Sequence, residues 1–258
     1  MTEIITKEEH PTLMECLKAF DGAKGETVKK KEDYLTEKFK ELATKMIYGG
    51  YFEVISGNDV VRQIYIHTVE FYYHEESPEE DPNAVRDYIV YHRNARKSKS
   101  NPNPTDNPLP PFPIGSLHTH ISGIDITFED NESFDQKNKK FIPKYRASAL
   151  IRSFRVVDLT KTKKDELKSK ETEKPDNHST HLYNALFMDT PVRDYLNIRI
   201  KWIDFKKWKG DFLDQNHRKN VGEYFNKKDR NGNPMYIKKD PFKQDERPWA
   251  FSRDPFKE

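Results

Sequence analysis

Several segments of the chain combine carboxylates, imidazoles and aromatic hydroxyls at the two-residue spacing of a β-strand. The clearest segment is His67–Tyr73, in which Glu70 and Tyr72 stand two residues apart. Successive side chains of a strand point to opposite faces, so Glu70 and Tyr72 share one face, with Thr68 beside them. A carboxylate next to a phenol could act as a general base that activates water. The alternative is that Glu70 faces solvent.

A second segment places two histidines close to a carboxylate. His118 and His120 share a strand face, and Asp125 follows shortly after them in the sequence. An H-x-H pair with a nearby carboxylate could bind zinc or iron. The imidazoles could instead be stacking surfaces and hydrogen-bond donors in a pocket, with Gly123 marking a bulge or a close approach to a ligand.

Two further side chains could complete such a pocket. Arg152 interrupts the apolar stretch Ala149–Ser153. A buried arginine needs a carboxylate or phosphate partner, and Glu70 and Asp125 are the candidates. An edge-strand position that reaches water is the alternative. His92 follows two tyrosines, although a lone histidine is more often structural than catalytic.

The composition predicts a folded domain with long polar loops. Only 34% of the 258 residues are hydrophobic, but 16 Phe, 13 Tyr and 3 Trp argue against disorder and predict an aromatic core. The single cysteine, Cys16, permits no intramolecular disulfide. Residues 1–10 are polar and acidic, and no stretch approaches the roughly 20 apolar residues of a membrane span. We therefore expect a cytoplasmic protein without membrane contact.

Charge is distributed unevenly along the chain, although its net charge is only +2. Residues 70–87 hold seven acidic side chains and one basic one, whereas residues 199–243 hold thirteen basic and six acidic ones. The basic stretch could follow a phosphate backbone. A solvated lysine-rich surface is the alternative reading of the same pattern.

The hydrophobic pattern predicts the elements that would position these side chains. We expect helices at 13–20, 31–48 and 182–188, and strands at 51–55, 60–73, 114–128, 146–157, 195–205 and 247–252. A helix followed by strands and polar loops predicts an α+β fold with a mostly antiparallel, curved sheet flanked by helices. This single domain would span residues 29–258 after a flexible segment, 1–28, and would carry a long proline-rich loop at 94–113.

Taken in order, these segments resemble the alkyladenine (methylpurine) DNA glycosylase family. In that family a hairpin strand carries a catalytic Glu and, two residues later, a pocket Tyr, which match Glu70 and Tyr72. The further similarities are a pocket histidine at His92, a glycine-led strand at Gly115–His120, an L-L-R strand at Leu150–Arg152, and later segments at Leu182–Leu186 and Pro248–Ser252. The resemblance extends over about residues 38–252.

The resemblance implies a base-excision-type N-glycosylase that cleaves a damaged or modified purine from DNA. Glu70 would activate water, and Arg152 would hold Glu70 or the water in place. The base pocket would contain Tyr72, His92, His118, His120, Ser122 and Asp125, and no metal or other cofactor would be required. We expect a monomer whose partner is DNA or another nucleobase-containing ligand, without a protein partner. Ser122 stands where the family has a tyrosine that inserts into the duplex.

The sequence leaves two other functions open. The chain could be a non-catalytic module that binds nucleobases or nucleic acid on the same fold, because a fold does not determine its function. It could also be a metal-dependent hydrolase that uses His118, His120 and Asp125. Convergence of His118 and His120 on a metal ion would favour the hydrolase, whereas a cleft lined by Glu70, Tyr72 and Arg152 would favour the glycosylase or the binding module.

Overall fold

The computed structural model describes residues 10–77, 81–87, 90, 110–120, 122–130, 133–135, 140–141, 143–160, 175–187, 197–208, 210, 213–218 and 247–253. The helices in these ranges are α1 (Leu13–Lys18), α2 (Val28–Tyr48) and α4 (His181–Phe187). The strands are β1 (Gly50–Ser56), β2 (Asp59–Glu75), β3 (Leu117–His120), β4 (Gly123–Thr127), β5 (Phe134–Asp135), β6 (Lys140–Phe141), β7 (Tyr145–Asp158), β8 (Ile198–Asp204), β9 (Leu213–Asn216) and β10 (Ala250–Arg253). None of the helices in the described ranges has the length and apolar character needed to cross a membrane.

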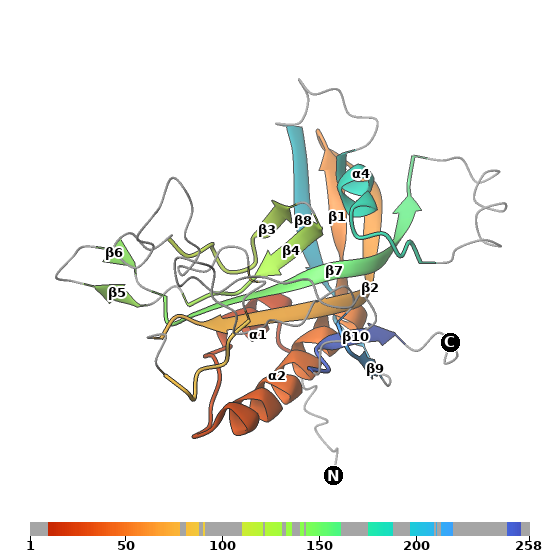
Figure 1. Cartoon of the computed structure of the whole chain (residues 1–258). Helices are drawn as coiled ribbons and strands as arrows, with labels where there is room; N and C mark the ends of the chain where they lie inside the picture. Colours follow the sequence, from red (N-terminus) through yellow and green to blue (C-terminus); the bar gives the residue numbers. More distant parts are fainter. Residues whose placement is uncertain are drawn as a thin grey trace, which may run out of the picture.

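Most strands belong to one antiparallel sheet in the order β3-β4-β7-β2-β1-β8 (Figure 1). Strand β10 also pairs with β2 and carries β9 on its other edge, while β5 and β6 form a separate pair. Helices α1 and α2 lie together on one side of the long strands β2 and β7 (Figure 1). The chain is thus a single α+β domain built around the β2–β7 pair.

The sheet is curled at the middle of β2. The first part of β2 pairs with β1, whereas Thr68–Glu70 pairs with β10 along the same edge. At this point the register between β2 and β7 shifts twice, between Ile66 and Thr68 and between Thr68 and Val69. Such irregularities bend a strand and increase its twist. They therefore allow β1 and β8 to diverge from β10 and β9.

Helix α2 places one apolar stripe against the sheet. The Thr27 side chain accepts a hydrogen bond from the Lys30 amide and caps the first turn. Leu35, Phe39 and other apolar residues recur at spacings of three and four and are buried. The helix ends at Tyr48, with Gly49 as its C-cap. Gly50 then begins β1 beside β8, where an added Cβ would be 2.2 Å from the Ile203 carbonyl oxygen, so this position requires glycine.

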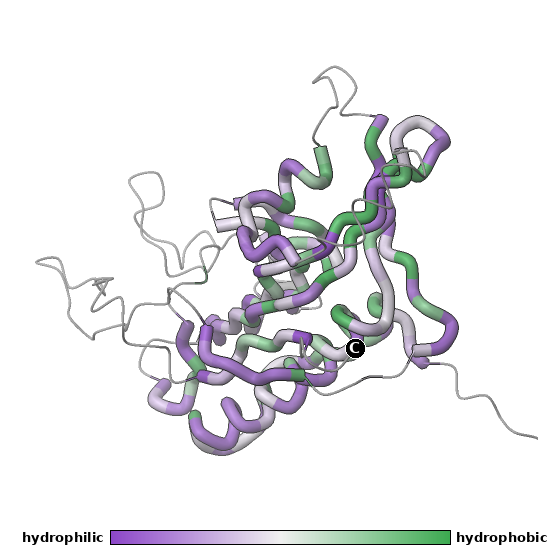
Figure 2. The backbone as a smooth tube through the Cα atoms, turned by 90° about the vertical axis from the view of Figure 1, so that its right-hand side faces the viewer, coloured by the Kyte–Doolittle hydropathy of each residue, from purple (hydrophilic) through white to green (hydrophobic). Residues whose placement is uncertain are grey.

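The core beneath α2 is built from aromatic rings, as the composition predicted. Phe39 stacks on Phe71 with ring centroids 4.6 Å apart and meets Trp249 edge-on at 5.1 Å. Phe20 meets Phe128 edge-on at 5.0 Å. Such ring pairs contribute about 0.5–1.5 kcal/mol each beyond the area they bury. Hydrophilic and hydrophobic residues are interspersed along the backbone (Figure 2).

The start of the chain corrects one expectation. We expected residues 1–28 to be flexible, but the part that is described, from His10, packs onto the domain. A capping box between Thr12 and Glu15 fixes the start of α1, and Leu13, Leu17 and Phe20 are buried in the core. The helix predicted at 13–20 is confirmed as α1, whereas its packing onto the domain was not predicted.

The predicted α2, α4 and main strands are confirmed to within a few residues at most ends. The region predicted as one strand at 114–128 is instead a hairpin of β3 and β4, because the chain turns at Ser122. The first residues of the proline-rich stretch, 94–109, lie outside the described residues, and so do positions 219–243 of the basic stretch.

The packing of α1 can be tested with Leu17→Ala. Leu17 is only 1% exposed, so its truncation should lower the free energy of unfolding by about 2–5 kcal/mol. The measurement is urea denaturation followed by circular dichroism. Lys18→Ala, at an exposed position of the same helix, is the control and should change little. Equal stability of Leu17→Ala and the parent chain would mean that α1 does not belong to the core.

Candidate functional site

The face of the sheet opposite α2 carries a row of buried polar side chains. Along β2, Phe71 points to the aromatic core, so Glu70 and Tyr72 point away from it. Glu70 is aligned with Leu150 of β7, and Leu150 is aligned with Asp125 of β4. Residues aligned across antiparallel strands share a face. We call Glu70, Tyr72, Asp125, Thr127 and Ser148 the polar face.

The Glu70 carboxylate is buried and is engaged by two neighbours. The Tyr72 hydroxyl donates a hydrogen bond of 3.0 Å to Glu70 Oε2, and Arg152 Nε lies 2.7 Å from the same oxygen. Glu70 is only 2% exposed. The solvent-facing alternative for Glu70 is therefore wrong, and the predicted pairing of Glu70 with Arg152 is confirmed.

The curl of the sheet explains how Arg152 reaches Glu70. Thr68 is aligned with Ser153, but the next residue, Val69, is aligned with Ile151. Arg152 is thus the extra residue of β7 at a register shift. Bulges of this kind redirect a side chain and occur often beside active sites. The local irregularity places a guanidinium next to the carboxylate.

The protonation of this cluster follows from its burial. Burial raises the pKa of Tyr72 well above its ordinary value, and the Glu70 carboxylate raises it further. Tyr72 therefore stays protonated and remains a donor. Burial opposes the charge of Arg152, but Tyr72 and Glu70 outweigh that effect and raise the pKa of Arg152. The cluster is thus a carboxylate held by a cation and a phenol, the arrangement in which a buried charge is tolerated.

A second cation, Arg218, contacts the ring of Tyr72. The Arg218 guanidinium carbon lies 4.8 Å from the centre of the Tyr72 ring, within the range of a cation–π contact. Arg218 also forms a buried ion pair with Asp87, and the Asp87 amide donates to Nδ1 of His74 at 3.1 Å. Sequence reasoning missed Arg218 and Asp87, because isolated charges in long polar segments carry no periodic signal.

Asp125 forms the second buried carboxylate of the polar face. Its Oδ1 lies 3.0 Å from His120 Nε2, and its Oδ2 accepts a hydrogen bond of 2.9 Å from the Ser148 hydroxyl. The Ser122 amide donates to His120 Nδ1 at 3.2 Å. Because Nδ1 accepts, we assign the ring proton to Nε2, which then donates to Asp125. His120 thus supports Asp125 at the edge of the face.

The other predicted pocket residues have different surroundings. The His118 ring lies 4.2 Å from the Phe112 ring and shares a face with Asp125. Ser122 contributes through its backbone, since its carbonyl accepts a hydrogen bond of 2.6 Å from Ser179. The close approach expected at Gly123 is also to Ser179, whose Cβ would be 3.0 Å from a Cβ at Gly123. His92 lies outside the described residues.

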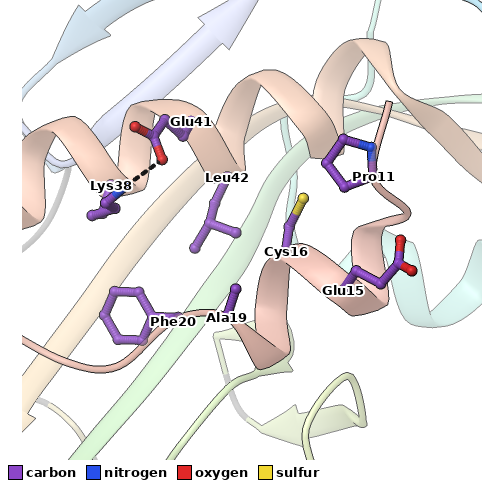
Figure 3. Close-up of a pocket in the computed structure, with 8 residues that line it drawn as sticks. All are labelled: Pro11, Glu15, Cys16, Ala19, Phe20, Lys38, Glu41 and Leu42. Atoms are coloured by element: carbon purple, nitrogen blue, oxygen red, sulfur yellow. Dashed lines mark hydrogen bonds and ion pairs between the residues drawn. The ribbon is translucent and has the colours of Figure 1, made fainter. Parts of the chain in front are cut away.

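A separate hollow of about 300 Å³ lies on the other side of the sheet, between α1 and α2 (Figure 3). Its lining residues are Pro11, Glu15, Cys16, Ala19, Phe20, Lys38, Glu41 and Leu42. Burial raises the pKa of the Cys16 thiol. Because the thiolate is the reactive form, a raised pKa argues against a cysteine nucleophile here. The polar face is therefore the stronger candidate for chemistry.

The buried phenol of Tyr72 makes stability depend on alkaline pH. Tyr72→Phe should destabilise the protein by about 1–3 kcal/mol at pH 7, because it removes the donor to Glu70. The folded-state pKa is raised, so the contribution of the hydroxyl is complete below the unfolded pKa of about 10 and is lost at higher pH. The difference between parent and variant should therefore shrink above about pH 10.

The measurement is the free energy of unfolding in urea across a pH series. Tyr183→Phe, at an exposed position on α4, is the matched control and should show neither effect. A constant difference between parent and Tyr72→Phe from pH 7 into the alkaline range would contradict the assigned environment of Tyr72.

Comparison of the chain with protein-family models, with curated proteins and with solved structures gave no match. The resemblance to alkyladenine DNA glycosylases therefore stays a prediction from the order of the sequence motifs. The chemistry of the polar face has to be inferred from its own side chains, of which Glu70, Tyr72 and Arg152 form the best-defined group.

Proposed function

We propose that the protein is an N-glycosylase that hydrolyses the glycosidic bond of a damaged or modified purine in DNA. The observation that carries this proposal is the buried Glu70 carboxylate, held through one oxygen by Tyr72 and Arg152. Burial of a carboxylate costs several kcal/mol unless partners compensate, so such an arrangement is typical of a group that is used. The motif order of the sequence adds support.

Glu70 acts as the general base in the proposed reaction. Contacts to one oxygen, Oε2, fix the orientation of the carboxylate, which then accepts a proton from a water molecule. The water oxygen forms a bond to the anomeric carbon of the sugar. The bond from that carbon to the purine nitrogen breaks, and its electron pair leaves with the base. Arg152 and Tyr72 are positioning residues for Glu70.

Asp125 favours a cationic base in this scheme. Asp125 and Glu70 are separated by one strand, which places their Cα atoms roughly 10 Å apart. Both are buried, and Asp125 is supported by the neutral donors His120 and Ser148. A purine alkylated on a ring nitrogen carries a positive charge, and positive charge also develops on the sugar as the bond breaks. A second buried carboxylate stabilises both charges.

The small side chain at Ser122 favours unpaired DNA as the preferred form of the substrate. A base must leave the helical stack before an enzyme can act on it, and an inserted side chain fills the gap in a duplex. Ser122 is too small to do so, and its backbone is engaged by Ser179 and His120. Single strands and mismatched sites lower the cost of extruding a base. We therefore propose activity on single-stranded DNA above that on a paired duplex.

The decisive experiment is base release from methylated and deaminated oligonucleotides, single-stranded and duplex, detected as cleavable abasic sites. Glu70→Gln should lower the rate by about 10²–10⁴-fold, because the amide cannot accept the proton of water. Glu37→Gln, at an exposed position on α2, is the control and should retain the parent rate.

Three outcomes separate the functions considered. Release that depends on Glu70 supports the N-glycosylase. Binding of the oligonucleotides without any release would instead identify a non-catalytic nucleobase-binding module. Release that persists in Glu70→Gln would exclude the mechanism, because the carboxylate would then have no part in it.

The charge of Asp125 generates a prediction about selectivity. Asp125→Asn should lower release of a cationic base such as 3-methyladenine more than release of neutral hypoxanthine, by about tenfold in their ratio. The measurement is the single-turnover rate on matched oligonucleotides that differ only in the modified base. Ser148→Ala, which removes a donor to Asp125 but keeps its charge, is the control and should leave the ratio nearly unchanged. An equal loss for both bases would show that Asp125 supports structure only.

A further inference from the structure

The segment 175–187 is fastened to the sheet at two places away from Glu70. Asp176 exchanges two backbone hydrogen bonds with Phe154 of β7, at 3.1 and 2.8 Å. The Ser179 hydroxyl donates to the Ser122 carbonyl in the β3–β4 turn at 2.6 Å. Helix α4, which follows, buries Leu182 against the domain. The short stretch between these anchors is therefore held in a defined position.

This stretch brings together two imidazoles and one carboxylate. Nδ1 of His181 lies 3.0 Å from Asp176 Oδ2, and Nδ1 of His178 lies 3.4 Å from Asp176 Oδ1. Ligand atoms of the three residues all lie within 4.8 Å of one another. The two rings stack with centroids 4.7 Å apart. Among the described residues, this is the group of three or more His, Cys, Asp or Glu side chains whose ligand atoms lie close enough to hold one metal ion.

The local backbone explains the D-x-H-x-x-H spacing of the cluster. The His178 amide donates to Asp176 Oδ1 at 2.8 Å, which turns the chain back over the carboxylate. The His181 amide then donates to the His178 carbonyl at 2.9 Å, so both rings emerge on the same side of one tight turn. The arrangement does not depend on long-range packing of the histidines themselves.

The distances suit a transition-metal ion. Zinc binds imidazole nitrogen and carboxylate oxygen at about 2.0–2.2 Å, so ligand atoms of a tetrahedral site lie roughly 3.4 Å apart. The ligand atoms of the three residues lie within 4.8 Å of one another, so only small side-chain rotations are needed to reach this spacing. His178 and His181 have 72% and 51% of their side chains exposed, so their rings can rotate without displacing core residues. As surface ion pairs alone, these contacts would contribute little to stability.

We propose that Asp176, His178 and His181 bind one divalent transition-metal ion of the zinc class. Two imidazoles and one carboxylate are ligands that zinc, cobalt and nickel accept, and three protein ligands leave a position for water. The ion fixes the turn at 176–181. This turn is anchored to β7 through Asp176 and to the β3–β4 turn, which carries His120 and Ser122, through Ser179. This site differs from the set His118, His120 and Asp125, and it stands whether or not the chain is a glycosylase.

The test is a titration of the full, untagged chain with Zn²⁺ at pH 7 by calorimetry, with Co²⁺ absorption as the second readout. The parent should bind one ion at this site, and its thermal midpoint should rise with Zn²⁺, because an ion bound to the folded state stabilises it. His178→Ala and His181→Ala should each weaken binding at least roughly tenfold and reduce the rise in midpoint. Both positions are exposed, so the variants should fold.

His217→Ala is the matched control, since His217 is an exposed histidine outside the cluster, and it should bind as the parent does. Absence of Zn²⁺ binding by the parent would overturn the proposal. Equal affinity in the parent and a His178→Ala, His181→Ala double variant would also overturn it, because the ion would then bind elsewhere. Neither result bears on base release, which is measured separately.

Discussion

The charge of Glu70, removed from water in the middle of a sheet, is the constraint on which the polar face depends. A buried carboxylate without compensating partners would cost several kcal/mol, and Arg152 and the Tyr72 hydroxyl are the partners that compensate Glu70. Tyr72 in turn needs a defined ring position, which Arg218 provides. One buried charge thereby requires an ordered set of neighbours from β2, β7 and the C-terminal part of the chain.

The same two strands carry the polar face and the aromatic core. On β2, Glu70 and Tyr72 alternate with Phe71, which stacks on Phe39 of α2. The rigid packing of the core therefore fixes the backbone from which the polar side chains project. The register shift that inserts Arg152 also allows the sheet to curl. Curvature and the position of the cation have a common origin.

The sequence predicted features that depend on local periodicity. Two-residue alternation placed Glu70 and Tyr72 on one face, and an arginine within an apolar strand predicted a carboxylate partner, which is Glu70. Contacts between distant segments carry no such signal. The pair of Arg218 and Asp87 joins positions 131 residues apart in the sequence, within polar stretches. The sequence predicted a helix at 13–20, but the packing of α1 against the core depends on contacts with distant segments, which is why segment 1–28 was expected to be flexible.

Charge balance argues for a cationic species at the polar face. Glu70 is neutralised by Arg152, whereas Asp125 is supported by an imidazole with its proton on Nε2 and by the Ser148 hydroxyl. Hydrogen bonds distribute the charge of Asp125 without cancelling it. A buried site with residual negative charge attracts a cation more strongly than a neutral ligand, because the local dielectric is low. A neutral base held only by stacking would gain nothing from this arrangement, whereas a reaction that develops positive charge would be stabilised by it.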